Sequence, residues 1–250
     1  MFSFYSQLST EVYDLDKPIG HSFGDVEYYN ERLKDCKGRI LEPAAGTGRI
    51  LIPLLEDGFE VDGMDYSPEM LQICRNHCEK RGLEPKLYEA DMSALALPEK
   101  YEAVILPTGS FLLLTDRKKS MEALDCFYNH LEDGGRLIID LFIPTEFEMG
   151  KVGTRSWKNQ DGDLITLESK LVDVNFINQT TIYHHKYEKW HNNKLIETEL
   201  EEFPLRWYGA EEFKLVLEKV GFKDITVSAD YEYGKEPTKD SEIITFEAKK

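Results

Sequence analysis

The segment 39–49 constrains the fold of this chain more than any other stretch, and it reads Arg-Ile-Leu-Glu-Pro-Ala-Ala-Gly-Thr-Gly-Arg. Its first apolar residues are typical of a short buried strand, and the apolar spacing within residues 50–55 predicts a helix after it. A strand, a tight turn of small residues and a helix open a nucleotide-binding α/β unit, in which ligands lie beyond the carboxyl ends of the strands. Gly46 and Gly48 let the backbone bend and approach such a ligand.

The kind of ligand follows from what this turn lacks. A dinucleotide site requires G-x-G-x-x-G, with the N-terminus of the helix facing a pyrophosphate. Gly46 and Gly48 supply the first two glycines, but Leu51 stands at the third position. The Glu42 carboxylate before the turn would repel a pyrophosphate, whereas it suits a ligand with a cationic portion. A turn that binds no ligand is the alternative that this motif alone leaves open.

Composition restricts the class of protein and of partner. With 250 residues, of which 41% are hydrophobic, the chain can bury one large core, or one core and a small subdomain. Its 47 acidic and 30 basic residues give a net charge of −17, which repels phosphate backbones and argues against a nucleic-acid partner. No apolar run is long enough to span a membrane, and residues 1–18 lack a signal-peptide pattern, so we expect a cytoplasmic protein without membrane contact.

The cysteine pattern indicates free thiols rather than a metal site. Four cysteines in a chain of this size, without a secretory signal, are typical of reduced cytosolic thiols. Cys74 and Cys78 are one turn apart on a predicted helix, but zinc requires further ligands and His77 faces another side. We therefore expect two semi-buried thiols and no bound metal.

A second predicted strand, residues 59–65, also ends in an acid. Asp65 lies 17 residues after the second glycine of the turn, close to the spacing at which an acid binds both ribose hydroxyls of a nucleotide. A carboxylate accepts two hydrogen bonds at once, which a vicinal diol supplies. Ser67 and Pro68 then begin a helix as its N-cap and first helical residue. Acids on adjacent strand ends, Glu42 and Asp65, favour a binding site over two surface carboxylates.

The pattern changes after residue 143. Up to that point strands and helices alternate, which favours a mostly parallel sheet with helices on both faces. Residues 152–207 instead show the alternation of antiparallel strands. The predicted strands are 39–41, 59–65, 86–90, 101–106, 136–142, 222–228 and 243–248 in the parent domain, and 164–176, 180–190 and 195–207 in the insertion; helices are predicted at 117–131 and 210–220.

The predicted fold class is therefore α/β: a Rossmann-like seven-stranded sheet with helices on both faces, plus a small antiparallel β cap. The expected domains are residues 1–150 with 208–250, which form the nucleotide-binding part, and residues 151–207, which form the inserted cap. A tight turn at residues 132–135 and a glycine stop at Gly221 set the limits of the elements between them.

Glu42-x-Ala44-x-Gly46-x-Gly48 resembles the first motif of the class I S-adenosylmethionine-dependent methyltransferases, which is written acid-x-G-x-G-x-G. Ala44 departs from this motif at its first glycine, which costs little if the backbone there keeps φ below zero. The resemblance covers residues 39–143 and, by topology, the helix and strands after the insertion. The insertion itself is similar to the cap of small-molecule N- or O-methyltransferases, such as the glycine and amino-sugar enzymes.

The resemblance implies S-adenosylmethionine as cofactor and a set of residues that bind it. Asp65 would take the ribose hydroxyls, and Asp91 would accept a hydrogen bond from the adenine amine, although Asp91 is also explained as a loop cap. Pro107 and Thr108, after the fourth strand, would lie beside the methyl group, and Tyr13 would contact the cofactor from an N-terminal segment that closes over it. The implied cofactor-binding residues are Tyr13, Glu42, Ala44, Gly46, Gly48, Asp65, Tyr66, Ser67, Asp91, Met92, Pro107 and Thr108.

The cap is expected to bind the methyl acceptor. Strand alternation places Tyr183, His185 and Tyr187 on one face, and these are the candidate catalytic residues, although none is identified as a base. The opposite face carries His184, Lys186 and Trp190. The candidates for binding an anionic part of the acceptor are Arg155, Trp157, Arg206 and Tyr208.

The implied reaction is an in-line displacement, in which the acceptor attacks the sulfonium methyl group and S-adenosylhomocysteine leaves. The expected acceptor is an N or O atom of a small molecule, because the chain lacks the Asn/Asp-Pro-Pro-Tyr/Phe motif used on nucleobase and glutamine amino groups. Two alternatives stay open: a non-catalytic module that binds S-adenosylmethionine, and a nicotinamide oxidoreductase, which Glu42 and the absent third glycine disfavour. We expect a monomer or a homodimer.

Overall fold

The structure is a computed structural model that describes residues 5–250. The chain divides into two compact units: the N-terminal residues up to Pro18 with Glu146–Arg206, and Ile19–Thr145 with Trp207–Lys250. The N-terminal helix thus groups with the segment 146–206, and the domain division expected from the sequence stays a prediction. No helix within residues 5–250 is long and apolar enough to cross a membrane.

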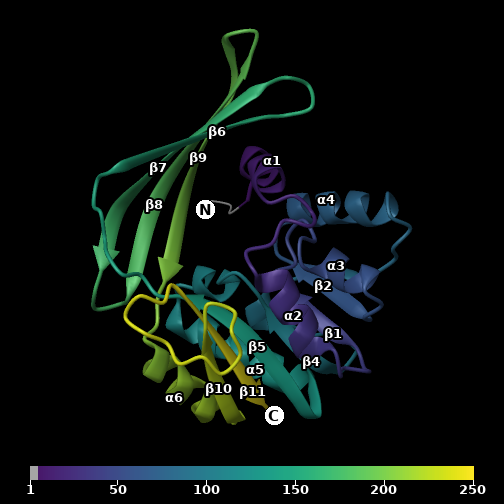
Figure 1. Cartoon of the computed structure of the whole chain (residues 1–250). Coiled ribbons are helices and arrows are strands. Elements are labelled where there is room, and N and C mark those ends of the chain that lie inside the picture. Colours follow the sequence, from purple (N-terminus) through teal and green to yellow (C-terminus); the bar gives the residue numbers. More distant parts are fainter. Residues whose placement is uncertain (1–4) are drawn as a thin grey trace. The chain divides into compact units, whose positions relative to one another are not determined.

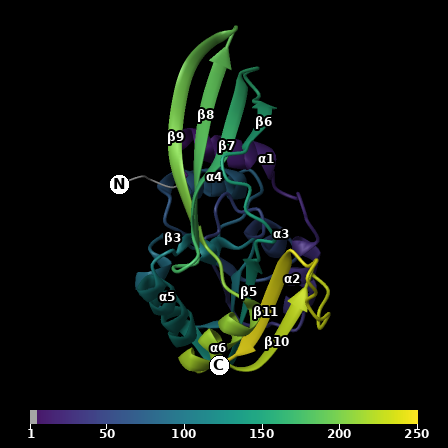
Figure 2. The ribbon, with the colours of Figure 1, turned by 90° about the vertical axis from the view of Figure 1, so that its left-hand side faces the viewer.

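The larger unit is built on a seven-stranded sheet in the order β10-β11-β5-β4-β1-β2-β3 (Figure 1). Strands β1 to β5 are parallel. Strand β11 lies between β5 and β10 and pairs antiparallel with both, so β10 and β11 form one end of the sheet (Figure 2). The strands are β1 (Ile40–Pro43), β2 (Val61–Asp65), β3 (Leu87–Glu89), β4 (Tyr101–Leu106), β5 (Leu131–Phe142), β10 (Lys223–Ala229) and β11 (Ile243–Lys249). The predicted seven-stranded, mostly parallel sheet is confirmed.

The direction in which the chain crosses this sheet determines which face each helix of the larger unit covers. The steps from β1 to β2 to β3 run one way and the step from β4 to β5 runs the other way. Right-handed crossovers therefore place α3 and α4 on one face and α5 on the opposite face. The helices are α2 (Asp25–Leu33), α3 (Leu51–Glu56), α4 (Pro68–Glu79), α5 (Arg117–His130) and α6 (Ala210–Val220), with short 3-10 turns η1 (Met92–Ala94) and η2 (Ser110–Leu113).

Residues close together in the sequence set where α4 begins, and the apolar central strands form the core. The Ser67 hydroxyl accepts the Met70 N–H (3.1 Å) as the N-cap of α4, and Pro68 is the first helical residue, as predicted. The central strands are continuous apolar runs because both faces of the sheet are covered. Val104 of β4 and Ile138 of β5 are fully buried. The core thus holds the strand ends at fixed positions.

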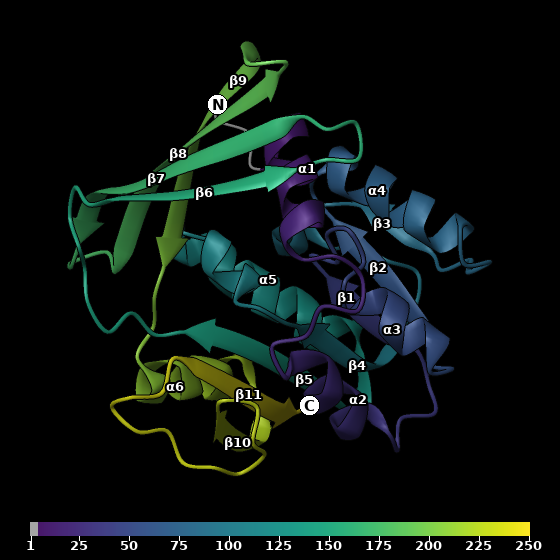
Figure 3. The same cartoon turned by 45° about the horizontal axis from the view of Figure 1, so that its top comes forward.

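The smaller unit is a four-stranded antiparallel sheet in the order β6-β7-β8-β9, with helix α1 (Gln7–Asp16) against one face (Figure 3). Its strands are β6 (Val152–Lys158), β7 (Leu164–Asn175), β8 (Thr180–His191) and β9 (Lys194–Arg206). Leu8 and Val12 of α1 pack with Ile165 and Tyr187 in a buried cluster. The helix therefore supplies the apolar surface that this face of the sheet needs. The edge strand β6 was not predicted as a separate strand.

Candidate functional site

Four strand ends bring predicted site residues to one edge of the larger sheet. The parallel strands β1 to β4 end at the same edge, and Glu42, Asp65, Asp91 and Pro107 stand at or just after these ends. The strand order reverses between β1 and β4, and ligands of open α/β sheets bind at such a switch point. The edge therefore forms one continuous candidate site rather than a set of separate surface acids.

Asp65 links the turn after β1 to the end of β2. Its Oδ2 accepts a hydrogen bond from the Gly46 N–H (2.8 Å), and its Oδ1 accepts one from the Ser67 N–H (2.9 Å). Burial raises the pKa of Asp65, while these backbone donors act to lower it. Each carboxylate oxygen has a second lone pair, so Asp65 keeps the capacity to accept hydrogen bonds from a ligand diol.

Glu42 is buried at the end of β1 with one unsatisfied carboxyl oxygen. The residue is 2% exposed, and its Oε2 has no hydrogen-bond partner within residues 5–250. Burial raises the pKa of Glu42 well above its usual range; the charge of Arg49 opposes this shift, and the charge of Asp65 adds to it. Because an unpaired buried polar group costs free energy, this oxygen marks a place for a ligand that donates a hydrogen bond or carries positive charge.

Arg49, the positive charge that acts on Glu42, is itself held in a buried ion pair. Its guanidinium bonds both carboxylate oxygens of Asp25 on α2, with an Nη1–Oδ1 distance of 3.1 Å, and donates to the His21 carbonyl (2.9 Å). Burial alone would raise the pKa of Asp25, but the hydrogen bond and charge of Arg49 hold it below its usual value. The pair joins α2 to the turn after β1, and within the described residues Glu42 forms no ion pair of its own.

The turn departs from the sequence expectation at Ala44. Its φ is 73°, in the left-handed region, where a residue with a Cβ carries a cost of about 1–2 kcal/mol. The condition under which alanine is harmless, φ below zero, is therefore not met. Gly48 has φ 92°, and a Cβ there would lie 2.9 Å from both Cys74 Sγ and Ile52 Cδ1. The contact that requires glycine at 48 is thus the packing of the turn against α3 and α4.

Asp91 caps the short helix η1, as the alternative interpretation proposed. Its Oδ1 accepts hydrogen bonds from the Ser93 N–H (2.8 Å) and hydroxyl (2.7 Å), and its Oδ2 lies 3.4 Å from Lys119 Nζ. Burial raises the pKa of Asp91, but these partners hold it below its usual value, so the group is ionised and Oδ2 can accept from a ligand amine. Tyr66 is 66% exposed and Met92 is half-buried, so both side chains are accessible at this edge.

One buried carboxylate near this edge was missed by the sequence analysis. Asp140, near the end of β5, accepts hydrogen bonds from the Thr108 N–H (3.0 Å) and from the hydroxyls of Thr245 (2.8 Å) and Tyr231 (3.0 Å). Thr108 has φ 54°, so Asp140 holds the loop after β4 in a left-handed conformation. The sequence does contain a signal for this role: Asp140 is an acid within an otherwise apolar strand. A buried acid in such a strand needs hydrogen-bond partners.

Asp140 predicts a pH dependence of stability. Burial raises its pKa from 3.8 to about 6. Between these values the folded protein binds the proton more tightly than the unfolded chain does, so the free energy of unfolding falls as pH rises, by about 3 kcal/mol in all.

The variant Asp140→Asn tests this dependence, because the asparagine side chain does not titrate. We therefore expect the unfolding free energy of the variant minus that of the wild type to rise by up to about 3 kcal/mol between about pH 4 and pH 7. Urea unfolding measures it, and a difference independent of pH would contradict this role.

The strand alternation predicted for the cap is confirmed. The ring centroids of Tyr183 and His185, and of His185 and Tyr187, are each 6.2 Å apart, so the three side chains share one face. Lys186 points to the other face, where it forms ion pairs with Glu168 and Glu188. The predicted candidates therefore form one cluster on the face that packs against α1.

A buried carboxylate that was not predicted completes this cluster. Glu201 on β9 is 3% exposed, and its Oε2 lies 3.4 Å from the Tyr187 hydroxyl and 3.5 Å from His185 Nδ1. The His185 ring stacks on Phe203 with centroids 5.0 Å apart. Tyr187 is buried with the α1 residues, so its ring packs the core of the smaller unit. Tyr183 and His185 are half-buried and remain partly accessible.

The other predicted acceptor residues are divided between the units. Arg155 forms an ion pair with Asp16 of α1, and Trp157 Nε1 donates to the same carboxylate (3.1 Å). Arg206, at the end of β9, is 7% exposed. Tyr208 belongs to the larger unit, where it is buried. Tyr13 lies on α1 with the Lys17 ammonium over its ring at 4.7 Å, in the smaller unit rather than with the other predicted cofactor residues.

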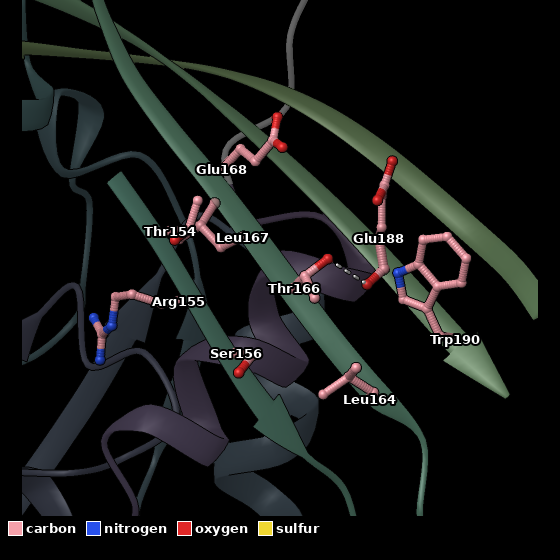
Figure 4. Close-up of a pocket in the computed structure, with 9 residues that line it drawn as sticks. All are labelled: Thr154, Arg155, Ser156, Leu164, Thr166, Leu167, Glu168, Glu188 and Trp190. Atoms are coloured by element: carbon pink, nitrogen blue, oxygen red, sulfur yellow. Dashed lines mark hydrogen bonds between the residues drawn. The ribbon is translucent and has the colours of Figure 1, made fainter. Parts of the chain in front are cut away.

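A hollow of about 610 Å³ lies on the face of the small sheet opposite α1 (Figure 4). Trp190, Leu164 and Thr166 are among the residues that line it. Tyr183, His185 and Tyr187 are not among them. It mixes polar and apolar side chains without a concentrated charge, so it indicates no particular ligand. Within residues 5–250 no group of three or more His, Cys, Asp or Glu side chains is arranged to hold a metal ion.

The fold and the acid-lined edge together are typical of an α/β domain whose switch point suits a nucleoside ligand with a cationic portion. A family described as a methyltransferase domain matches residues 40–135. The chain is similar to a putative methyltransferase of Bacillus subtilis, with 29% identity over 217 residues that make up 86% of this chain and 85% of that protein. It is also similar to the glycine/sarcosine N-methyltransferase of Aphanothece halophytica, with 27% identity over 226 residues that cover 84% and 76% of the two chains.

Among solved structures, an amino pentose methyltransferase from Micromonospora echinaspora with bound S-adenosylmethionine has the same fold. Its TM-score is 0.72 at 19% identity, over 100% of this chain and 99% of that one. Residues 40–135 thus match a methyltransferase domain, and the whole chain has the fold of an S-adenosylmethionine-dependent methyltransferase, which disfavours the nicotinamide alternative.

Proposed function

We propose that this enzyme transfers a methyl group from S-adenosylmethionine to an amine nitrogen of a small molecule, with the cofactor bound along the carboxyl edge of the larger sheet. The observation that carries the proposal is the buried Glu42 carboxyl, whose unpaired oxygen stands beside Asp65 at the turn after β1. S-adenosylmethionine brings an ammonium and a sulfonium group to such a site, together with a ribose diol.

Each acid at this edge then has one task in cofactor binding. Glu42 faces the cationic methionine portion, and Asp65 accepts from the ribose hydroxyls through the lone pairs that Gly46 and Ser67 leave open. Asp91 accepts the adenine amine through Oδ2. The cofactor supplies a methyl group that its positive sulfur already activates, so the protein contributes mainly orientation and exclusion of water.

The loop after β4 is proposed to lie beside the transferred methyl group. β4 pairs with β1 across the switch point, so Pro107 and Thr108 follow the strand next to the Glu42 turn. Asp140 fixes this loop by accepting the Thr108 N–H (3.0 Å). A loop held in one conformation gives the methyl group one position, which a displacement in line requires.

The acceptor is proposed to bind on the cap face that carries Tyr183 and His185. Aromatic rings and the buried Glu201 carboxylate suit an amine, whether neutral or protonated. A neutral amine needs no strong base, whereas an ammonium must first lose a proton. His185 is proposed to take that proton, and its Nδ1 lies 3.5 Å from Glu201 Oε2 without a hydrogen bond to it. The similarity to a glycine/sarcosine enzyme supports an amine over a hydroxyl.

Thermal unfolding with ligands tests the cofactor part of the proposal. S-adenosylmethionine and S-adenosylhomocysteine are expected to raise the melting temperature, because a ligand that binds only the native state stabilises it by mass action. NAD and NADP, the control ligands, are expected to have no effect. No shift with either sulfur ligand at saturation would contradict the cofactor site.

A panel of acceptors tests the second part, with glycine, sarcosine and a nucleotide-linked amino sugar compared against alcohols and phenols. Methylation of an amine is expected, and His185→Ala should reduce turnover far more than it reduces cofactor affinity. Trp190→Ala, on the same strand but the opposite face, is the matched control and should leave turnover nearly unchanged. Transfer to hydroxyl acceptors alone, or equal effects of both variants, would overturn the assignment of this face.

A further inference from the structure

We propose that Glu42 is protonated in the cofactor site before a ligand binds, and that it gives up one proton to solvent when the ammonium group of the ligand binds. The inference rests on the proposed cofactor site, and adds to it the protonation change that accompanies binding.

The geometry places Glu42 where a lone carboxylate is poorly tolerated. The residue is the third of the four residues of β1, a strand that is buried along its whole length, and its Oε2 has no hydrogen-bond partner within residues 5–250. At Asp65 two backbone N–H groups donate at 2.8 and 2.9 Å, whereas the one backbone N–H that acts on Glu42, from Leu51, leaves Oε2 without a partner within residues 5–250. Hydrogen bonds to the charged form favour ionisation. Of the two neighbouring acids, Glu42 is therefore the one that stays protonated until a ligand satisfies it.

The charged and titratable groups around Glu42 support the same conclusion. Arg49 is the cation that faces it, but its charge is largely offset by Asp25 of α2 in the buried pair. Asp65 on β2 faces it with a like charge. Cys74 on α4 is neutral, since a hydrogen bond with Cys78 and burial raise the pKa of its thiol. These groups together supply no net positive charge that would ionise Glu42 in the empty site.

A bound ammonium changes this balance. An opposite charge within a few ångströms favours the carboxylate, and its N–H groups satisfy the oxygen that has no partner. The O–H bond of the Glu42 carboxyl breaks, the proton passes to water or buffer, and no bond between heavy atoms changes. A nucleoside thioether without an ammonium offers neither the charge nor the donors, so it is expected to bind with Glu42 still neutral.

Titration calorimetry measures the coupling directly. S-adenosylhomocysteine is titrated at about pH 7 into the full-length protein in buffers of different ionisation enthalpy. The dependence of the binding enthalpy on the buffer gives the number of protons released. We expect about one proton per ligand, and an affinity that rises by up to about tenfold per pH unit while Glu42 is protonated in the empty protein. 5′-Methylthioadenosine, which has the nucleoside and sulfur but no ammonium, should release none.

Two variants assign the proton to a residue. Glu42→Gln keeps the size of the side chain and removes its charge, so S-adenosylhomocysteine should bind about 10- to 100-fold more weakly and without proton release. The affinity for 5′-methylthioadenosine should stay nearly unchanged. Asp65→Asn, the matched variant of the neighbouring acid, should weaken both ligands through the ribose and retain the proton release.

The outcomes separate this inference from the proposed function. Tight binding of S-adenosylhomocysteine without proton release, or proton release that persists in Glu42→Gln, would overturn the coupling and leave the cofactor site standing. Equal proton release with 5′-methylthioadenosine would overturn the role of the ammonium. A wild-type protein that binds none of these ligands contradicts the proposed function itself, and the inference with it.

Discussion

Removal of the whole smaller unit is expected to abolish methyl transfer while cofactor binding stays nearly intact. The change deletes the residues up to Pro18 and replaces Glu146–Arg206 with a short Gly-Ser linker. The larger unit keeps its seven-stranded sheet and the acids at the strand ends, so it can still bind S-adenosylhomocysteine. It loses the cap residues proposed to orient the acceptor, and transfer depends on that orientation. Calorimetry and a turnover assay measure the two properties separately.

The N-terminal helix has to be removed together with the cap. Leu8 and Val12 of α1 are buried against Ile165 and Tyr187, so deleting the sheet alone would expose their apolar side chains. A variant that lacks only Glu146–Arg206 is the control, and we expect it to be less soluble than the double deletion. Full turnover by the double deletion would contradict the assignment of the acceptor to the smaller unit.

Asp65→Ala is expected to weaken the binding of S-adenosylmethionine by about 1.5–3 kcal/mol, or roughly 10- to 150-fold, as is usual for hydrogen bonds to a charged group. The same change leaves the N–H groups of Gly46 and Ser67 without their acceptor, so stability should also fall, by about 1–3 kcal/mol. The fold should survive, because Asp65 stands at the end of a strand and not in its core. Calorimetry gives the affinity, and circular dichroism with urea unfolding shows that the variant is folded.

The matched control for this change is Glu89→Ala. Glu89 ends β3 directly beside Asp65 in the strand register, and it is exposed. The variant Glu89→Ala removes the same charge at the same edge of the sheet, so it reports the effect of net charge alone. A folded Asp65→Ala protein with wild-type affinity, or an equal loss of affinity in Glu89→Ala, would remove Asp65 from the cofactor site.

The sequence alone determined the features that depend on neighbours in the chain. The strand, small-residue turn and helix around residues 40–56 follow from apolar spacing and glycine positions, and α4 begins at Ser67 because the cap and the capped N–H groups are a few residues apart. The alternation of β8 placed Tyr183, His185 and Tyr187 on one face for the same reason. Acids predicted at the ends of β1 and β2 also came together, because parallel neighbours end at one edge.

Tertiary structure decided the features whose partners are far apart in sequence. Asp140 is satisfied by Thr245, 105 residues away, and Tyr187 meets Glu201 through the register of two strands. Apolar spacing gives α1 a buried face but does not say what covers it, and that face packs on Ile165 of β7 and Tyr187 of β8. Among residues 5–250, the Asp140 carboxylate is paired and Glu42 Oε2 has no partner. This difference depends on donors that the fold brings together, because burial and its energetic cost exist only once distant segments pack.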